Sequence, residues 1–407
     1  MKFIPISFLL STLFYFSGPT AGIRLFFTQS KVAFDSTLIT IPFGVKFGPV
    51  SEAYLNEKKP KIDSFYKKFI NSPYYSGSFI VAKNGRIIYE DYQGFANAKT
   101  GEKIDANTAI HLASVSKVLT ATAILKLVQE DNLMLDQKVT DWIPKFPYKN
   151  TTIRTLLNHR SGLPHYSNFP GIMKKAWNRK KVLTNQDILD LMIKQKFKPV
   201  FADNARFDYC NTNYVILALI IERATGQNYR DAMQTLIFKP LGMKNTFVFN
   251  YETDRDTVCK SYRSSTVFPW DQYDNLYGDK NIYSTPRDLV KFDLATYAAE
   301  FIKPELLQEA YYGYSAAKVA KPIKDYGLGM RMRFLPPNGE KMVYHNGWWH
   351  GNNTSFVPVK KDTVTVICLG NKYSNRPYAT LSMVSSLFYQ KKTEIETPVP
   401  AELELGE

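Results

Sequence analysis

The chain has 407 residues, of which 44% are hydrophobic and 22% charged. These proportions exclude a wholly disordered chain, a collagen and a coiled coil, and the length suffices for a large core without disulfide bonds. The net charge of +15 is scattered and no nucleic-acid motif accompanies it, so we expect a solvated basic surface and no nucleic-acid partner.

The N-terminus has the pattern of an export signal. Lys2 is followed by an apolar run over 3–16 and then by small residues, which is typical of a signal peptide over 1–22. We therefore expect a periplasmic or secreted protein. Apolar residues resume at 23–27, so an uncleaved signal that anchors the chain in a membrane stays open as an alternative. The stretch 23–60 has no clear period and is interpreted as a leader.

The body of the chain, placed at 61–392, opens with a hairpin. Apolar runs at 79–82 and 86–89 flank Asn84 and Gly85. This dipeptide is the strongest short signal for a two-residue hairpin turn.

Helices are expected to follow, and the sheet to be completed at the far end of the chain. A helix is predicted over 114–131, a helical and loop-rich lobe over 150–280, a buried strand over 362–369 and a closing helix over 379–389. An acidic tail at 393–407 is expected to be disordered. This order predicts an α+β fold: an antiparallel sheet flanked by helices, an inserted mainly helical lobe, and the active site in the cleft between them.

The cysteines and histidines do not follow a metal-binding pattern. Cys210, Cys259 and Cys368 are expected to be buried free thiols, with a Cys210–Cys259 bridge as the alternative. No His-Glu-x-x-His sequence is present. We therefore expect neither a catalytic metal nor another cofactor.

A Ser-x-x-Lys motif is the first candidate for chemistry. Residues three apart on a helix share a face, so a Lys can take the proton of a Ser one turn earlier. The motif occurs at Ser64–Lys67, Ser114–Lys117 and Ser315–Lys318. The pair at Ser114 opens a long helix with an apolar face, and this context selects it.

Two further motifs carry polar groups that can act on a carbonyl. Tyr209 and Asn211 precede an apolar helix, and His345 and Gly347 enter a stretch rich in Gly and Asn. A phenol beside a lysine can relay protons, and an amide can hold a substrate carbonyl. Each motif alone is weak, since a Tyr-x-Asn most often marks a turn.

Together the three motifs resemble those of the penicillin-recognising serine hydrolases, in particular the class C β-lactamase-related group. The flanking segments 152–164, 207–214 and 240–246 resemble the group's signatures T-I-R-x-L-L-x-H-x-S-G-L-P, F-x-Y-S-N-x-x-Y and P-L-G-M-x-x-T. The resemblance spans about 75–390 and implies a β-lactamase/transpeptidase-like fold.

The chain departs from the group's pattern at several points. Cys210 stands where Ser is usual, 203–204 replaces Pro-Gly, and 278–281 replaces a run richer in glycine. The third motif is His-Asn-Gly instead of Lys-Thr-Gly. Because His carries less positive charge at neutral pH, this change disfavours β-lactam hydrolysis.

The resemblance implies a mechanism. Ser114 would form an acyl-enzyme, and Lys117 and Tyr209 would share the proton transfers. Asn211 would position the substrate, and His345 would orient the leaving side or a substrate carboxylate. The backbone N–H groups of Ser114 and of Trp348, which follows Gly347, would form the oxyanion hole.

The resemblance leaves several activities open. The first expectation is an exported serine hydrolase that cleaves an ester or amide bond in a small molecule or a peptidoglycan-derived peptide. A D,D-peptidase, penicillin-binding protein or β-lactamase is the alternative. A non-catalytic member that binds cell-wall fragments, and a structural protein that binds a partner through its basic surface, are further ones.

Overall fold

The computed structural model describes residues 37–169, 182–315, 324–335 and 339–389, all within one compact unit that begins at Thr37. The expected signal segment and the acidic tail lie outside these residues. No helix in the described ranges is long and apolar enough to cross a bilayer.

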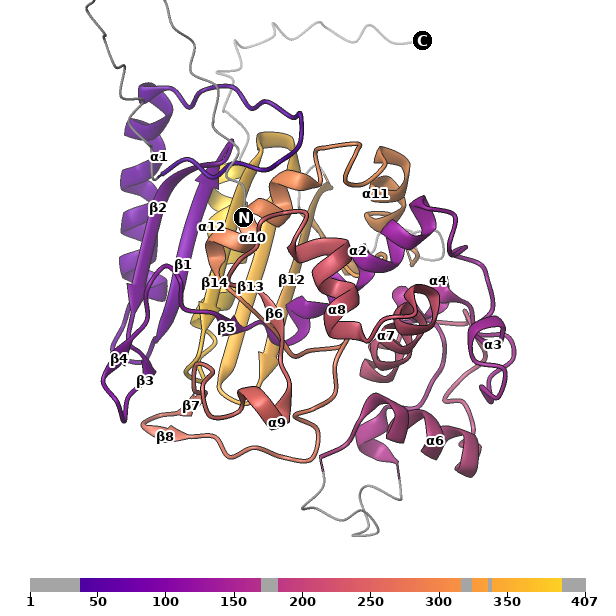
Figure 1. Ribbon diagram of the computed structural model, residues 1–407. Helices are drawn as coiled ribbons and strands as arrows, with labels where there is room; N and C mark the ends of the chain where they lie inside the picture. Colours follow the sequence, from indigo (N-terminus) through magenta and orange to yellow (C-terminus); the bar gives the residue numbers. More distant parts are fainter. Residues whose placement is uncertain (1–36, 170–181, 316–323, 336–338, 390–407) are drawn as a thin grey trace, which may run out of the picture. The chain divides into compact units, whose positions relative to one another are not determined.

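A seven-stranded antiparallel sheet forms the largest layer (Figure 1), in the order β10-β11-β12-β13-β14-β1-β2. Its strands are β1 (Gly77–Lys83), β2 (Arg86–Gln93), β10 (Lys324–Tyr326), β11 (Arg331–Leu335), β12 (Glu340–Trp349), β13 (Asn352–Val359) and β14 (Val364–Gly370). The predicted hairpin is confirmed, because Asn84 and Gly85 join β1 to β2 with φ of 53° and 80°. The predicted late strand is β14, which pairs with β1 and so closes the sheet with distant chain segments.

Helices cover both faces of this sheet. On one face, α1 (Glu52–Phe65), η1 (Tyr66–Ile70) and α12 (Thr380–Phe388) share one hydrophobic cluster with the strands. On the other face, α10 (Pro286–Ala295) packs against β1 and β14. Because both faces are covered, the central strands β1, β13 and β14 are buried at nearly every position. The α+β class with an antiparallel sheet is confirmed.

The start of α1 corrects one expected boundary. The limit between leader and body was placed at residue 60, and Pro60 lies inside α1. Ser51 caps the helix, since its side chain accepts from the backbone N–H of Tyr54. The residues of α1 do not show an apolar helical periodicity, so the sequence pattern did not predict a helix there.

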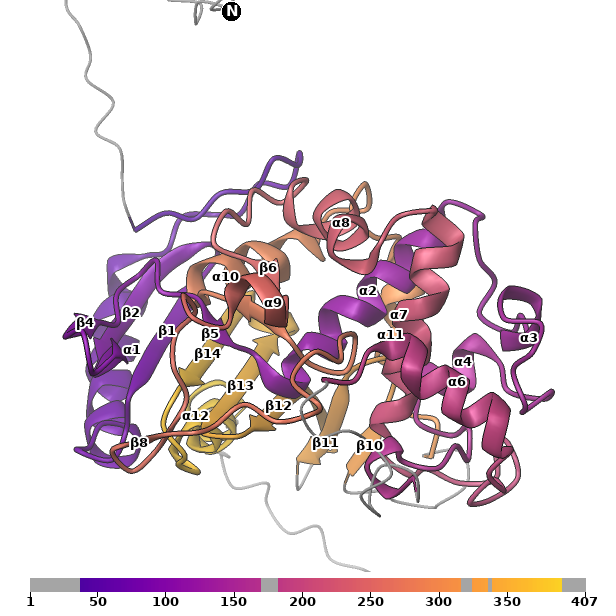
Figure 2. The ribbon, with the colours of Figure 1, turned by 60° about the horizontal axis from the view of Figure 1, so that its bottom comes forward.

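The mainly helical lobe centres on α7 (Asn211–Thr225), which α2 (Ser116–Gln129), α4 (Ile153–Leu157), α6 (Asn185–Gln195) and α8 (Tyr229–Met233) contact. Figure 2 shows α2 running between the large sheet and α7. The lobe therefore includes the predicted helix at 114–131. The range 150–280 is also less purely helical than expected, because it contains three short strands.

Shorter elements complete the described chain. The remaining strands are β3 (Phe95–Asn97), β4 (Glu102–Lys103), β5 (Ile110–His111), β6 (Phe247–Val248), β7 (Tyr262–Arg263), β8 (Thr266–Val267) and β9 (Ile282–Ser284). The remaining helices are η2 (Ala113–Val115), α3 (Val139–Trp142), η3 (Tyr166–Asn168), η4 (Gln234–Phe238), α9 (Tyr251–Asp254), α11 (Pro304–Ala310), η5 (Lys360–Asp362) and η6 (Arg376–Ala379). All three cysteines are free, so the alternative bridge is not formed.

Candidate active site

Ser114 lies in the 3-10 turn η2, directly before α2. The preceding residue, Ala113, has a φ of 49°, which is unfavourable for a residue with a side chain. The buried ring of His111 holds this turn: its Nδ1 accepts from the backbone N–H of Ala113 (3.0 Å), and its Nε2 contacts Asn281 Oδ1 (2.8 Å). Burial lowers the pKa of His111 to about 4. The neutral ring can therefore accept at one nitrogen and donate at the other.

The segment 278–282 supports the nucleophile region along its length. Besides the His111–Asn281 contact, the Leu112 N–H donates to Ile282 O (2.8 Å) and the Ile282 N–H to Ser116 Oγ (3.1 Å). Strands β5 and β9 continue this pairing in a small sheet with β6. The segment 278–281, which departs from the group's sequence pattern, therefore lies against α2, the helix that carries Lys117.

Lys117 lies one helical turn after Ser114 and is fully buried. Its Nζ is 3.2 Å from Ser114 Oγ and 2.7 Å from the backbone oxygen of Asp279. The predicted contact between the two motif residues is therefore present. By contrast, Lys67 of the first Ser-x-x-Lys motif is exposed and pairs with Asp63.

Tyr209 and Asn211 flank this pair from the start of α7. The Tyr209 ring centroid is 5.1 Å from Lys117 Nζ. Its hydroxyl and the Asn211 Oδ1 are buried, and neither forms a hydrogen bond with a residue that the structure describes. Unpaired buried polar atoms are costly, and such atoms at a pocket mark positions where a substrate can bind.

His159, from the signature at 152–164, positions the Tyr209 motif. Its ring centroid is 4.3 Å from that of Tyr209, and its Nδ1 accepts from the backbone N–H of Cys210 (3.1 Å). Burial lowers its pKa well below the usual range, so the ring is neutral. The sequence shows this residue within the signature, but its pattern did not mark it as part of the site.

The third motif lies within β12, which continues beyond the strand-like run that the sequence predicted. Gly347 packs directly against η2, because a methyl group there would lie 2.4 Å from the carbonyl oxygen of Leu112. Only glycine permits this approach. The backbone of β12 at Gly347 and Trp348 is thereby held beside Ser114, as an oxyanion hole at these residues requires.

An open pocket of about 380 Å³ joins these residues. It is lined by Ser114, Tyr209, Asn211, Arg331, Tyr344, Asn346, Gly347, Trp348 and Tyr378. Five of the predicted site residues line it. Trp348 is 61% exposed at the pocket, so it belongs to the wall and not to the core.

His345 does not line this pocket. It is fully buried, its Nδ1–H donates to the carbonyl of Asn346 (2.8 Å), and its Nε2 accepts from the Tyr326 hydroxyl (3.0 Å). Burial, followed by the charge of Arg331, lowers its pKa well below the usual range. The expectation of direct contact with a leaving group or carboxylate therefore does not fit its position.

Arg331 brings a positive charge to the pocket. Its guanidinium carbon is 4.5 Å from the Tyr209 ring centroid and 5.7 Å from that of Tyr326. In the described ranges it forms no ion pair. No sequence signal marks Arg331, because it lies 14 positions before His345, on the neighbouring strand β11.

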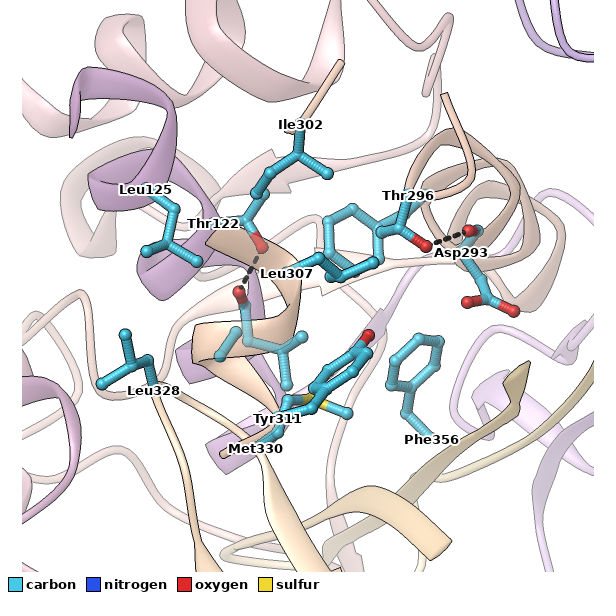
Figure 3. Close-up of a pocket in the computed structure, with 13 residues that line it drawn as sticks. Thr122, Leu125, Asp293, Thr296, Ile302, Leu307, Tyr311, Leu328, Met330 and Phe356 are labelled. Atoms are coloured by element: carbon cyan, nitrogen blue, oxygen red, sulfur yellow. Dashed lines mark hydrogen bonds between the residues drawn. The ribbon is translucent and has the colours of Figure 1, made fainter. Parts of the chain in front are cut away.

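A second cavity lies behind α2 and is not a substrate site. Figure 3 shows its apolar lining, including Leu307 and Phe356, with the hydroxyls of Thr122 and Thr296 bonded to protein partners. Its volume of about 20 Å³ holds one water molecule.

One cluster has the composition of a metal site. Within the described residues, Asp271, Asp274 and His350 have possible ligand atoms within 4.8 Å of one another. The Asp274 carboxylate already has hydrogen-bond partners within the protein. Its Oδ1 accepts from Trp349 Nε1 (2.7 Å) and contacts His350 Nε2 (2.9 Å). None of the three lines the pocket, so we assign no metal to the site.

Known proteins share this sequence pattern and fold. Residues 72–385 match the family model described as Beta-lactamase. Penicillin-binding protein 4* of Bacillus subtilis is 31% identical over 344 residues, which cover 79% of this chain and 73% of the relative. Esterase EstB of Burkholderia gladioli is 31% identical over 195 residues, 44% of this chain and 48% of the relative. A penicillin binding protein from Bacillus halodurans shares the fold, with a TM-score of 0.68 at 22% identity over 80% of this chain and 99% of that one.

Proposed function

Because the chain belongs to the beta-lactamase family and is a serine hydrolase, we propose that it cleaves an amide or ester bond through an acyl-enzyme on Ser114. We further propose that its substrates carry a negative charge beside the scissile carbonyl. The contact between Ser114 and Lys117 supports the first part, and Arg331 in the pocket supports the second.

In the first step, Ser114 Oγ attacks the carbonyl carbon and loses its proton. Lys117 Nζ, 3.2 Å away, accepts the proton if the amine is neutral, and the Asp279 carbonyl keeps the amine in place. The carbonyl oxygen becomes an oxyanion, which the N–H groups of Ser114 and Trp348 stabilise. One such donor is worth about 3–4 kcal/mol.

In the second step, the leaving group takes a proton and departs. The Tyr209 hydroxyl, near Lys117 and without a described partner, relays this proton from the lysine. Asn211 Oδ1 accepts a hydrogen bond from the substrate. Water then attacks the acyl-enzyme, and the same groups act in reverse to release the acid and regenerate Ser114.

Arg331 carries the substrate proposal. A guanidinium that lines a pocket without an acidic partner among the described residues matches a carboxylate in both charge and geometry. A peptide with a free C-terminus presents such a carboxylate next to its last amide. Penicillins present one next to the β-lactam carbonyl, and one relative is named as a protein that binds them.

The test compares two substrates that differ in one charge. An N-acyl dipeptide with a free carboxylate should be cleaved with at least about tenfold higher kcat/KM than its C-terminal amide, since a charge-assisted hydrogen bond contributes about 1.5–3 kcal/mol. Arg331→Met should remove this preference. Arg333→Met on the same strand, outside the pocket, is the control and should keep it. Equal rates for both substrates with the unaltered protein would contradict the substrate proposal.

An esterase is the second candidate, because one relative carries that name and 31% identity. Tyr344, Trp348 and Tyr378 give the pocket aromatic walls, which favour an apolar acyl group. Turnover of p-nitrophenyl esters without cleavage of either dipeptide would favour this reading. Turnover of the chromogenic cephalosporin nitrocefin would favour a β-lactamase.

We also propose that the chain is exported, from the pattern at 1–22. Expression of the full chain followed by fractionation tests this. Recovery outside the cytoplasm with a new N-terminus supports a cleaved signal. Recovery in the membrane with Met1 intact supports an anchor.

A further inference from the structure

A charged pair is buried next to α2, the helix that carries Lys117. Asp279 and Lys280 are 1% and 2% exposed. Lys280 Nζ lies 3.4 Å from Asp279 Oδ2. Tyr166 completes the group: its hydroxyl donates to Asp279 Oδ2 (2.9 Å) and lies 3.1 Å from Lys280 Nζ. Burying two charges is costly, so a pair at this place calls for a role beyond stability.

The pair is directly connected to the proposed base. Asp279 is the residue whose backbone oxygen accepts from Lys117 Nζ at 2.7 Å. Burial lowers the pKa of Lys280, the Asp279 and Asp274 carboxylates raise it, and the charge of Lys117 lowers it further. Two buried lysines therefore contact the same residue, Lys117 at the backbone oxygen of Asp279 and Lys280 at its carboxylate.

Among the described residues, aromatic rings, histidines and an arginine also lie around Lys117. They are the rings of Tyr209 and Tyr214 at 5.1 and 5.6 Å, the guanidinium of Arg331, and the rings of His159, His165 and His345. Burial lowers the pKa of each of these histidines, to about 4 for His165. All three are therefore neutral at pH 7.

We propose that Lys280 is a positioning residue that neutralises the Asp279 carboxylate and thereby keeps Lys117 available as a neutral base. Without Lys280, the buried Asp279 carboxylate would lose its ion-pair partner, and its negative charge would favour the protonated form of Lys117. The Asp279–Lys280 pair also fixes the peptide that orients Lys117 toward Ser114. This inference rests on the proposed acyl-enzyme function.

The test follows the acylation of Ser114 as a function of pH. The rate constant for labelling by a fluorophosphonate is measured by intact mass between pH 5 and 9. Three variants are compared with the unaltered protein: Lys280→Met, Asp279→Asn, and the two together. Lys360→Met is the control, since it breaks a second, partly buried pair, Lys360–Asp293, whose residues do not line the pocket.

Lys280→Met should move the acidic limb of the profile to higher pH by about one unit, which is a tenfold slower reaction on that limb. Asp279→Asn should leave the limb at or below its original pH. The double variant should return to within about threefold of the unaltered rate, and Lys360→Met should keep the original profile. A merely structural role would instead slow labelling equally at every pH.

Two results would overturn the inference: an unmoved limb in Lys280→Met, or a double variant no faster than Lys280→Met. If Lys280→Met does not fold, Tyr166→Phe takes its place. That change removes a hydrogen-bond donor from Asp279 and should move the acidic limb of the pH profile in the same direction by a smaller amount. An unchanged acidic limb in Tyr166→Phe would also overturn the inference. Absence of labelling in the unaltered protein would refute the proposed function itself, whereas normal labelling with unmoved profiles would refute this inference alone.

Discussion

A methyl group placed on Gly347 would lie 2.9 Å from the backbone nitrogen of Ser114. Strand β12 therefore runs directly against the nucleophile turn, and the two elements share no room for a side chain. The proposed oxyanion hole, formed by backbone N–H groups from both elements, requires this closeness.

Gly347→Ala tests that arrangement. The added methyl must push β12 away from η2, because the carbonyl of Leu112 is backbone and cannot rotate aside. We expect kcat to fall by about 10²–10³, the effect of losing one oxyanion donor. Steady-state kinetics on a generic ester measures this loss. Retention of more than half the activity would show that β12 does not contribute to the oxyanion hole.

The Tyr209 hydroxyl gives a prediction in which activity and stability separate. It is buried and has no hydrogen-bond partner among the described residues. Tyr209→Phe should therefore leave the free energy of unfolding unchanged within about 0.5 kcal/mol. The rate should fall by about 10²–10⁴, because the proton relay is lost. Urea unfolding and kinetics on the same preparation check both parts. A large loss of stability with normal turnover would show that the Tyr209 hydroxyl has a structural role and does not relay protons.

His111 gives a prediction about pH. Its pKa is about 4 in the folded protein and about 6.5 in an unfolded chain, so the unfolded chain binds the proton first as the pH falls. Stability is therefore fully present above pH 6.5 and decreases down to pH 4. The contribution of this residue is roughly 3 kcal/mol.

His111→Asn keeps an acceptor near the Ala113 N–H and does not titrate. The variant should be less stable than the unaltered protein at pH 7, and the difference should shrink toward pH 4. Urea unfolding at several pH values measures it. A difference that stays constant with pH would show that His111 does not titrate with the shifted pKa.

Local patterns predicted most of the elements that place the site. Asn84 and Gly85 predicted the hairpin, and the spacing of Ser114 and Lys117 at the start of an apolar helix predicted their contact. These features depend on neighbours in sequence, so a single chain reveals them. Tyr209 was expected near this pair only from the resemblance to a known family.

The parts that depend on distant contacts were missed. Arg331 reaches the pocket because β11 pairs with β12, and the sequence pattern around it is that of an ordinary strand. The resemblance of the His-Asn-Gly motif implied that His345 contacts the substrate, but strand alternation turns successive side chains to opposite faces. Its ring is therefore buried against Tyr326, whereas Asn346 lines the pocket.

The central claim is that Ser114 is a nucleophile activated by the contact with Lys117. Intact-mass analysis after incubation with a fluorophosphonate, followed by peptide mapping, tests it most directly. We predict one adduct on Ser114, no adduct in Ser114→Ala, and a loss of at least about 10⁴ in hydrolysis rate for that variant. An adduct on another residue, or unchanged hydrolysis by Ser114→Ala, would contradict the account.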